Sequence, residues 1–201
     1  VGTDTFISVL VPPSTCARCH STEAQQFDES GHFRSYRQIV PKDSLHALVQ
    51  VHEGQEHSEF QNAPGETGCM QCHGSEILLD ENNRPTPETW PNMGMGNVYP
   101  DGSTGNCSTC HTRHKFTIAE ARKPDACAAC HLGPDHPQNE IYEESKHAVA
   151  FRDLKDKMKL DAHHWVLGED YTQAPTCATC HMSGHSRNGG KVTHDPGERI
   201  S

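Results

Sequence analysis

The chain has 201 residues, a formal net charge of −10 and a hydrophobic fraction of 33%. That fraction is below the roughly 45–50% of ordinary globular domains, and such a composition alone is typical of disordered chains. The acidic charge argues against nucleic acid as a partner and favours a basic patch on a protein partner. Ten cysteines and 16 histidines are unusual in a disordered chain. We therefore expect a non-protein group to supply the missing apolar core.

Three segments predict helices. The first is 21–39, the second is 116–123, which stops at Pro124, and the third is 139–161, which contains neither Gly nor Pro. The 16 Gly and 13 Pro cluster between the motifs and predict loops and turns, and strand signals are weak. We expect a mainly α fold with extensive irregular loops, wrapped around a stack of cofactors. It should form a single domain over 1–201, with 1–15 as an N-terminal extension.

All ten cysteines fall into five Cys-x-x-Cys-His motifs: CARCH, CMQCH, CSTCH, CAACH and CATCH. This motif is the attachment signature of c-type haem, because two thiols add to the two haem vinyl groups and the adjacent His binds the iron. Structural zinc usually needs two Cys-x-x-Cys pairs per ion, so five pairs would leave one over. A redox Cys-x-x-Cys normally occurs once. We therefore predict five covalently bound haems c.

The predicted attachment residues are Cys16, Cys19, Cys69, Cys72, Cys107, Cys110, Cys127, Cys130, Cys177 and Cys180. The predicted proximal iron ligands are His20, His73, His111, His131 and His181. Only 20 residues separate the start of CSTCH from the start of CAACH. This short gap predicts that two of the haems lie close together.

Haem attachment of this type takes place outside the cytoplasmic membrane, so we expect a periplasmic or extracellular protein. The N-terminal sequence VGTDTFISVLVPPS lacks the basic region of a signal peptide, and we expect a processed N-terminus. No run approaches the ~20 apolar residues of a transmembrane helix. Expected partners are other redox proteins or further copies of the same chain, as a homo-oligomer or an end-to-end assembly.

Eleven further histidines could supply the second axial ligands. A haem that only carries electrons usually has both axial sites filled, whereas a haem that binds a substrate has one open side. His114 lies too close in sequence to His111 to reach the opposite face of the same haem, so as a ligand it would serve a neighbour. The same reasoning separates His136 from the iron of His131. His136, preceded by Asp135, could be a ligand, a catalytic group beside a metal, or part of a polar turn. Methionine ligation is a weaker alternative.

Long segments of the chain resemble the hydroxylamine oxidoreductase family of multihaem cytochromes. They are RPTPETWPNMGMG, YPDGSTGNCSTCHTRHKF, EARKPDACAACHLGPDHPQNEIYEESKH, APTCATCHM and THD. The resemblance covers about residues 69–199 and extends more loosely back to residue 16. Family members carry eight haems per chain, and this chain would correspond to the middle five. CMQCH then matches the five-coordinate catalytic haem of the family.

The resemblance also implies ligands. His46, His114, His147 and His194 would be distal ligands of the four other haems, with His32 as a competing candidate.

The resemblance further implies a catalytic role for Asp135 and His136. They would face the open side of the haem bound by Cys69 and Cys72, and handle protons as a small nitrogen compound changes oxidation state. Histidine suits this role because its pKa is near neutral and a neighbouring carboxylate can bias it.

The sequence departs from the family in two places. It contains neither the first two haem segments nor the last haem with the long C-terminal helices, which build the family trimer. In oxidative members those helices carry a Tyr that crosslinks to the catalytic haem, and members without it tend to work in the reductive direction. We favour an electron-transfer protein. The alternative is an enzyme that oxidises or reduces hydroxylamine, nitrite or hydrazine at the CMQCH haem.

Overall fold

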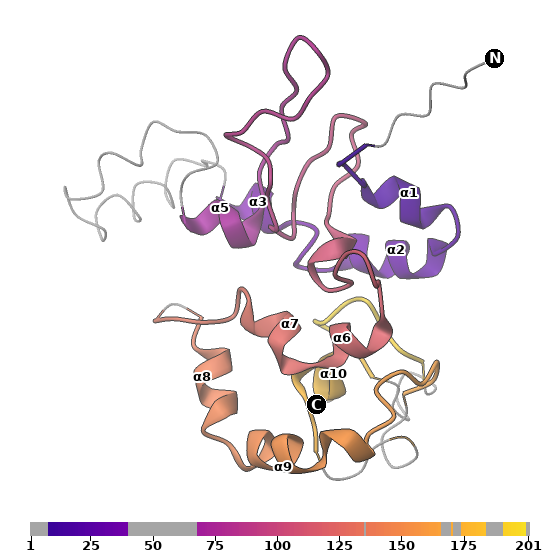
Figure 1. Cartoon of the computed structure of the whole chain (residues 1–201), viewed down its shortest axis with the longest axis vertical. Coiled ribbons are helices and arrows are strands. Elements are labelled where there is room, and N and C mark those ends of the chain that lie inside the picture. Colours follow the sequence, from indigo (N-terminus) through magenta and orange to yellow (C-terminus); the bar gives the residue numbers. More distant parts are fainter. Residues whose placement is uncertain are drawn as a thin grey trace.

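The structure is a computed structural model that describes residues 8–39, 68–134, 136–165, 170, 174–183 and 191–199. Short helices joined by irregular loops make up this part of the chain, as Figure 1 shows. One half of the molecule holds α1 (Pro13–Ala17), α2 (Ser21–Glu29), α3 (Ser35–Ile39) and α5 (Gly68–His73). The other half holds α6 (Ile118–Arg122), α7 (Pro124–Ala128), α8 (Gln138–Glu143), α9 (Lys146–Leu154) and α10 (Cys177–His181). Two 3-10 turns, η2 (Cys107–Thr109) and η3 (Lys155–Lys157), complete the helical elements.

The predicted mainly α fold with extensive irregular loops is confirmed for these ranges. They contain no strand and only three isolated β-bridges. No helix in them is long and apolar enough to cross a membrane.

Each of the five motifs lies on or overlaps a helical turn: CARCH on α1, CMQCH on α5, CSTCH on η2, CAACH on α7 and CATCH on α10. In a helix, residues three apart lie on the same side. In α10, which holds the whole CATCH motif, Cys177 and Cys180 therefore lie on one side of the helix, with His181 next to them. This is the local geometry that attachment of one planar group at two points requires.

The prediction of one helix over 21–39 is wrong. α2 ends at Glu29, and α3 begins only at Ser35. Ser30 has an extended backbone (ψ 162°), and its hydroxyl donates a 2.6 Å hydrogen bond to the Phe27 carbonyl. This serine satisfies the helix end locally, and Gly31 follows it, so the chain turns there.

The prediction of one helix over 139–161 is also wrong. α8 ends at Glu143, and Ser145 caps α9 by accepting a hydrogen bond from the Ala148 N–H. A serine that caps a new helix competes with continuation of the preceding one. The prediction for 116–123 is confirmed over α6, which ends before Pro124, the first residue of α7.

The buried apolar core is small. The buried hydrophobic residues of the described ranges are Ile77, Met95, Tyr99, Ala148, Phe151, Trp165, Ala174 and Ala178. Trp165, the largest fully buried side chain of the described residues, packs with Ala178 of the CATCH helix. The Arg122 guanidinium lies 4.8 Å from the Trp165 ring centroid and donates hydrogen bonds to the carbonyls of Leu160 and Ala162. This cluster joins α6 and α10 to the segment after α9.

The loop after Asn92 packs its backbone directly against the CMQCH helix. The N–H of Met95 donates to the Cys72 carbonyl (2.9 Å), and the N–H of Gly96 donates to the His73 carbonyl (3.1 Å). A Cβ atom on Gly94 would lie 2.1 Å from the backbone nitrogen of Gly74. Only glycine fits at this contact, because the obstacle is main chain and cannot rotate away.

We expect Gly94→Ala to destabilise the protein by about 1–3 kcal/mol or more, as overpacking against a rigid neighbour does. Thermal unfolding of the haem-loaded protein measures this. Gly31→Ala is the matched control, because a Cβ atom there would meet nothing within 4 Å. Equal unfolding temperatures for the two variants would contradict the close backbone contact.

Candidate functional site

The main chain fixes the rings of three motif histidines. Nδ1 of His73 lies 3.2 Å from the Ser35 carbonyl oxygen, and Nδ1 of His181 lies 2.8 Å from the Pro196 carbonyl oxygen. The backbone of Thr117 hydrogen-bonds to His111. A carbonyl can only accept, so Nδ1 of His73 and of His181 carries the proton and Nε2 is left with a lone pair. Such bonds orient imidazoles that ligate metals, and the donor set therefore fits an iron bound through Nε2.

Three motif histidines also lie beside a second histidine from elsewhere in the chain. The ring centroids are 6.3 Å apart for His111 and His194, 6.1 Å for His131 and His32, and 6.0 Å for His73 and His136. Metal–imidazole bonds are about 2 Å long and the nitrogen lies about 1.1 Å from the ring centre, so imidazoles on opposite sides of one metal have centroids about 6.3 Å apart. All three separations fit one iron between each pair. The ring planes meet at 23°, 54° and 68°, respectively.

His136 has two motif histidines as neighbours. Its ring centroid also lies 6.4 Å from that of His131. A tight turn joins these two residues: the His136 N–H donates to the Gly133 carbonyl, and the Asn139 N–H donates to the His131 carbonyl. Because a turn this short could not pass around a haem edge, His136 would serve an iron held by His73 and not one held by His131. Its side chain is exposed.

Burial favours the neutral form of several histidine side chains, which is the form that ligates a metal. It lowers the pKa of each of four histidines, His32, His73, His111 and His194, because desolvation disfavours the charged imidazolium. Neighbouring histidines lower these pKa values further. Neutral imidazole is the species that ligates iron.

The thiols of different motifs lie against one another. Cys16 raises the pKa of Cys107, Cys72 raises the pKa of Cys130, and Cys177 raises the pKa of Cys127, as thiols in close proximity do. Burial, together with the neighbouring Cys72 and Cys110, raises the pKa of Cys130 to about 12. CAACH is therefore the central motif, with CSTCH, CMQCH and CATCH as neighbours and CARCH beyond CSTCH. The described cysteines form no disulfide.

The donor arrangement differs from that of a structural zinc site. Within the ranges given above, no three His, Cys, Asp or Glu side chains gather around a point that could hold a metal ion. Structural zinc takes four such ligands, whereas haem iron takes two axial ligands from the protein. The histidine pairs match the haem requirement.

The remaining predicted site residues are exposed or lie outside the described residues. His114 and His147 are exposed, and neither ring lies beside a motif histidine of the described chain. His20 is 70% exposed, with Nδ1 4.0 Å from a Glu23 oxygen. His46, Asp135 and the side chain of Cys69 lie outside what the structure describes.

Sequence reasoning missed Ser35, Thr117 and Pro196, whose backbones hold the proximal rings. Ser35 also donates its hydroxyl to the His73 carbonyl at 2.8 Å. A backbone carbonyl is common to every residue type. No sequence signal could have found these contacts.

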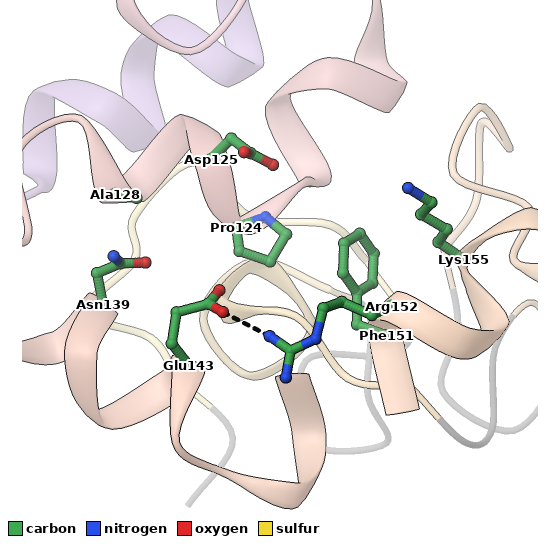
Figure 2. A pocket seen from close by; sticks show the side chains of 8 residues that line it. All are labelled: Pro124, Asp125, Ala128, Asn139, Glu143, Phe151, Arg152 and Lys155. Carbon is green, nitrogen blue, oxygen red and sulfur yellow. Dashed lines mark hydrogen bonds and ion pairs between the residues drawn. The ribbon is translucent and has the colours of Figure 1, made fainter. Parts of the chain in front are cut away.

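A polar surface cleft of about 330 Å³ lies between α7, α8 and α9 (Figure 2). The ion pair between Glu143 and Arg152 (2.6 Å) spans part of it, as the dashed line shows. Its lining is Pro124, Asp125, Ala128, Asn139, Glu143, Phe151, Arg152 and Lys155, with no Cys or His among them. The cleft adjoins the CAACH helix and is separate from the histidine pairs.

Comparison with known proteins identifies two family models. The model described as "Seven times multi-haem cytochrome CxxCH" matches residues 101–196, and "Cytochrome c554 and c-prime" matches residues 15–93. A Kuenenia stuttgartiensis protein named "Probable nitrite reductase-hydroxylamine oxidoreductase fusion protein" is 32% identical over 237 aligned positions. The alignment covers 89% of this chain and 27% of that protein, so the chain spans about a quarter of its relative's length.

Two solved structures are similar over nearly the whole chain. A "Hypothetical multiheme protein" is 34% identical with a TM-score of 0.78, over 94% of this chain and 40% of its own. A reducing HAO-like protein complex of Kuenenia stuttgartiensis is 30% identical with a TM-score of 0.57, over 92% of this chain and 30% of its own.

Proposed function

Because the chain belongs to the hydroxylamine oxidoreductase-like family of multihaem c-type cytochromes, we propose that it carries electrons through five covalently bound haems c. The observation that carries this proposal is the second histidine facing His73, His111 and His131. Haem iron supplies a one-electron redox centre, and two axial imidazoles leave no coordination position for a substrate.

The ten motif cysteines would tether the haems, and the five motif histidines would be the proximal ligands. We propose that His111 pairs with His194, His131 with His32, and His73 with His136. His20 and His181 would then take their distal ligands from His46, His114 and His147. Under this assignment the chain holds enough histidines to fill both axial positions of every iron.

The contacts between thiols support an order for the electron path. CARCH neighbours CSTCH, and CAACH neighbours CSTCH, CMQCH and CATCH. Once the thiols are thioethers, these contacts would bring the edges of consecutive haems together. The CAACH haem would be the branch point of the path.

The setting follows from the same chemistry. We propose that the chain is one pentahaem domain in the periplasm or outside the cell. Its partners would be redox proteins or further copies of itself. The net charge of −10, to which haem carboxylates add, favours a basic surface on the partner. The similar solved structure named as a complex agrees with such assembly.

The test of this proposal is the spin state of the purified protein. Absorption and electron paramagnetic resonance spectra are expected to show only low-spin haems, and carbon monoxide is expected to leave the reduced spectrum unchanged. The intact mass should correspond to the chain plus five haems. A high-spin haem that binds carbon monoxide would contradict the closed arrangement.

A second candidate function rests on the exposed position of His136 beside His73. The CMQCH haem would then be open, and Asp135 and His136 would handle protons for a reaction of hydroxylamine, nitrite or hydrazine. A high-spin haem together with turnover of one of these compounds would favour the enzyme over the carrier.

A further inference from the structure

Two buried hydrogen-bond donors lie together without acceptors where the first and third motifs meet. They are the Tyr99 hydroxyl, on a residue only 3% exposed, and Nη2 of Arg113. Arg113 acts on the phenol electrostatically: burial raises the pKa of Tyr99, and the guanidinium opposes this rise. Leaving a buried donor unpaired costs about 1–3 kcal/mol, and more for a charged group. A pair of such donors therefore indicates a missing acceptor.

The neighbouring segments hold both donors in place. Nη1 of Arg113 donates to the Val9 carbonyl (2.7 Å), and the guanidinium carbon lies 5.6 Å from the Trp90 ring centroid. Tyr99 begins a tight turn in which its N–H donates to the Ser103 carbonyl and its own carbonyl accepts from the Gly102 N–H. The site is thus fixed before any ligand binds.

Two polar side chains near the site, Asp101 and Asn97, already have hydrogen-bond partners. One oxygen of Asp101 accepts from the Ser14 hydroxyl (2.5 Å), and the other accepts from the Ser103 N–H and hydroxyl. The Asn97 amide hydrogen-bonds to the phenol oxygen, which lowers the pKa of Tyr99; the same side chain accepts from the Ser75 N–H and donates to a carbonyl, so it offers the phenol O–H no acceptor. Arg113 forms no ion pair with any carboxylate of the described ranges.

We propose that Tyr99 and Arg113 bind a carboxylate, and that this carboxylate is a propionate of a haem attached at CARCH or CSTCH. Both motifs flank the site. Ser14 of the CARCH helix donates a hydrogen bond to Asp101, in the turn that begins at Tyr99. Cys107 of CSTCH is near enough to the phenol to raise the pKa of Tyr99, and it lies close to Cys16 of CARCH. A guanidinium and a hydroxyl together suit a planar anion with two oxygens. The proposal rests on the haem attachment proposed above, and holds whether the protein is a carrier or an enzyme.

The test is a spectroelectrochemical titration of the haem-loaded protein. In Arg113→Gln the equilibrium constant for reduction of one haem should fall about tenfold, a shift of ~59 mV for one electron, because loss of a cation favours the ferric state. Tyr99→Phe should shift the same haem in the same direction by less. Arg84→Gln, which removes an exposed arginine, should leave every potential unchanged. If Arg113→Gln does not accumulate, Arg113→Lys replaces it in the titration. Because lysine keeps the charge, the shift in reduction potential should be smaller.

Infrared redox difference spectra identify the carboxylate. Haem labelled with carbon-13 at its propionate carboxyls should give label-sensitive bands that move in Tyr99→Phe and stay in Arg84→Gln. The proposal is overturned if these bands and all potentials are the same in every variant. It is also overturned if added formate binds the wild-type protein saturably and no longer binds Tyr99→Phe, which would make this a site for a free anion. The intact mass of each variant reports haem attachment separately.

Discussion

In the variant His136→Ala, one haem is expected to become high-spin and to bind carbon monoxide when reduced. The His136 ring centroid lies 6.0 Å from that of His73, and alanine offers no nitrogen to an iron held by His73. The coordination position would then be open to water or an added ligand. Absorption and electron paramagnetic resonance spectra, with a carbon monoxide titration, measure the fraction of haem that is high-spin, which should be one haem in five.

His164→Ala is the matched control, because His164 is also exposed and belongs to none of the histidine pairs among the described residues. This variant should keep the wild-type spectrum. If wild-type protein already binds carbon monoxide and His136→Ala instead abolishes turnover of nitrite or hydroxylamine, His136 is a catalytic group and the carrier assignment is wrong.

Removing the central haem is expected to divide the electron path. In the double variant Cys127→Ser, Cys130→Ser the intact mass should fall by one haem, because a hydroxyl does not add to the haem vinyl groups. The CARCH and CSTCH haems would lose their connection to the CMQCH and CATCH haems, since all the described thiol contacts between the two groups pass through CAACH. Stopped-flow reduction should then split into a fast and a slow phase.

Ala129→Ser is the control for this prediction. It introduces a hydroxyl between the same two cysteines and leaves both thiols in place. Its mass and reduction kinetics should match those of the wild-type protein. A single unchanged reduction phase in the double variant would show that electrons do not pass through this position.

The sequence predicted what depends on neighbouring residues. The five motifs require one local spacing, and Pro124 stops α6 where the pattern indicated. The two helix predictions failed at serines: Ser30 and Ser145 bond to nearby backbone and end or begin a helix. A serine in a helical pattern is ambiguous by sequence alone, because it serves as either a cap or an interior residue.

The histidine pairs could be predicted only in part. His32 and His131 are 99 residues apart, and no periodicity joins them across that distance. Resemblance to a family pointed to His194 as a distal ligand but did not reveal which proximal ring it faces. That partner, His111, depends on the path of the C-terminal segment, which the His194 N–H fixes by donating to Gln26 of α2. Such contacts arise from tertiary packing.

The small core around Trp165 and Ala178 bears on how the protein is degraded in the cell. The described ranges bury little apolar surface, and a polypeptide of that kind resists proteases poorly until its prosthetic groups are in place. Incompletely matured chains would be degraded, and fully loaded chains would persist. Steady-state abundance would therefore report how completely the cell's haem-attachment machinery has acted, and a shortage of haem would lower the amount of protein before it lowered the activity per molecule.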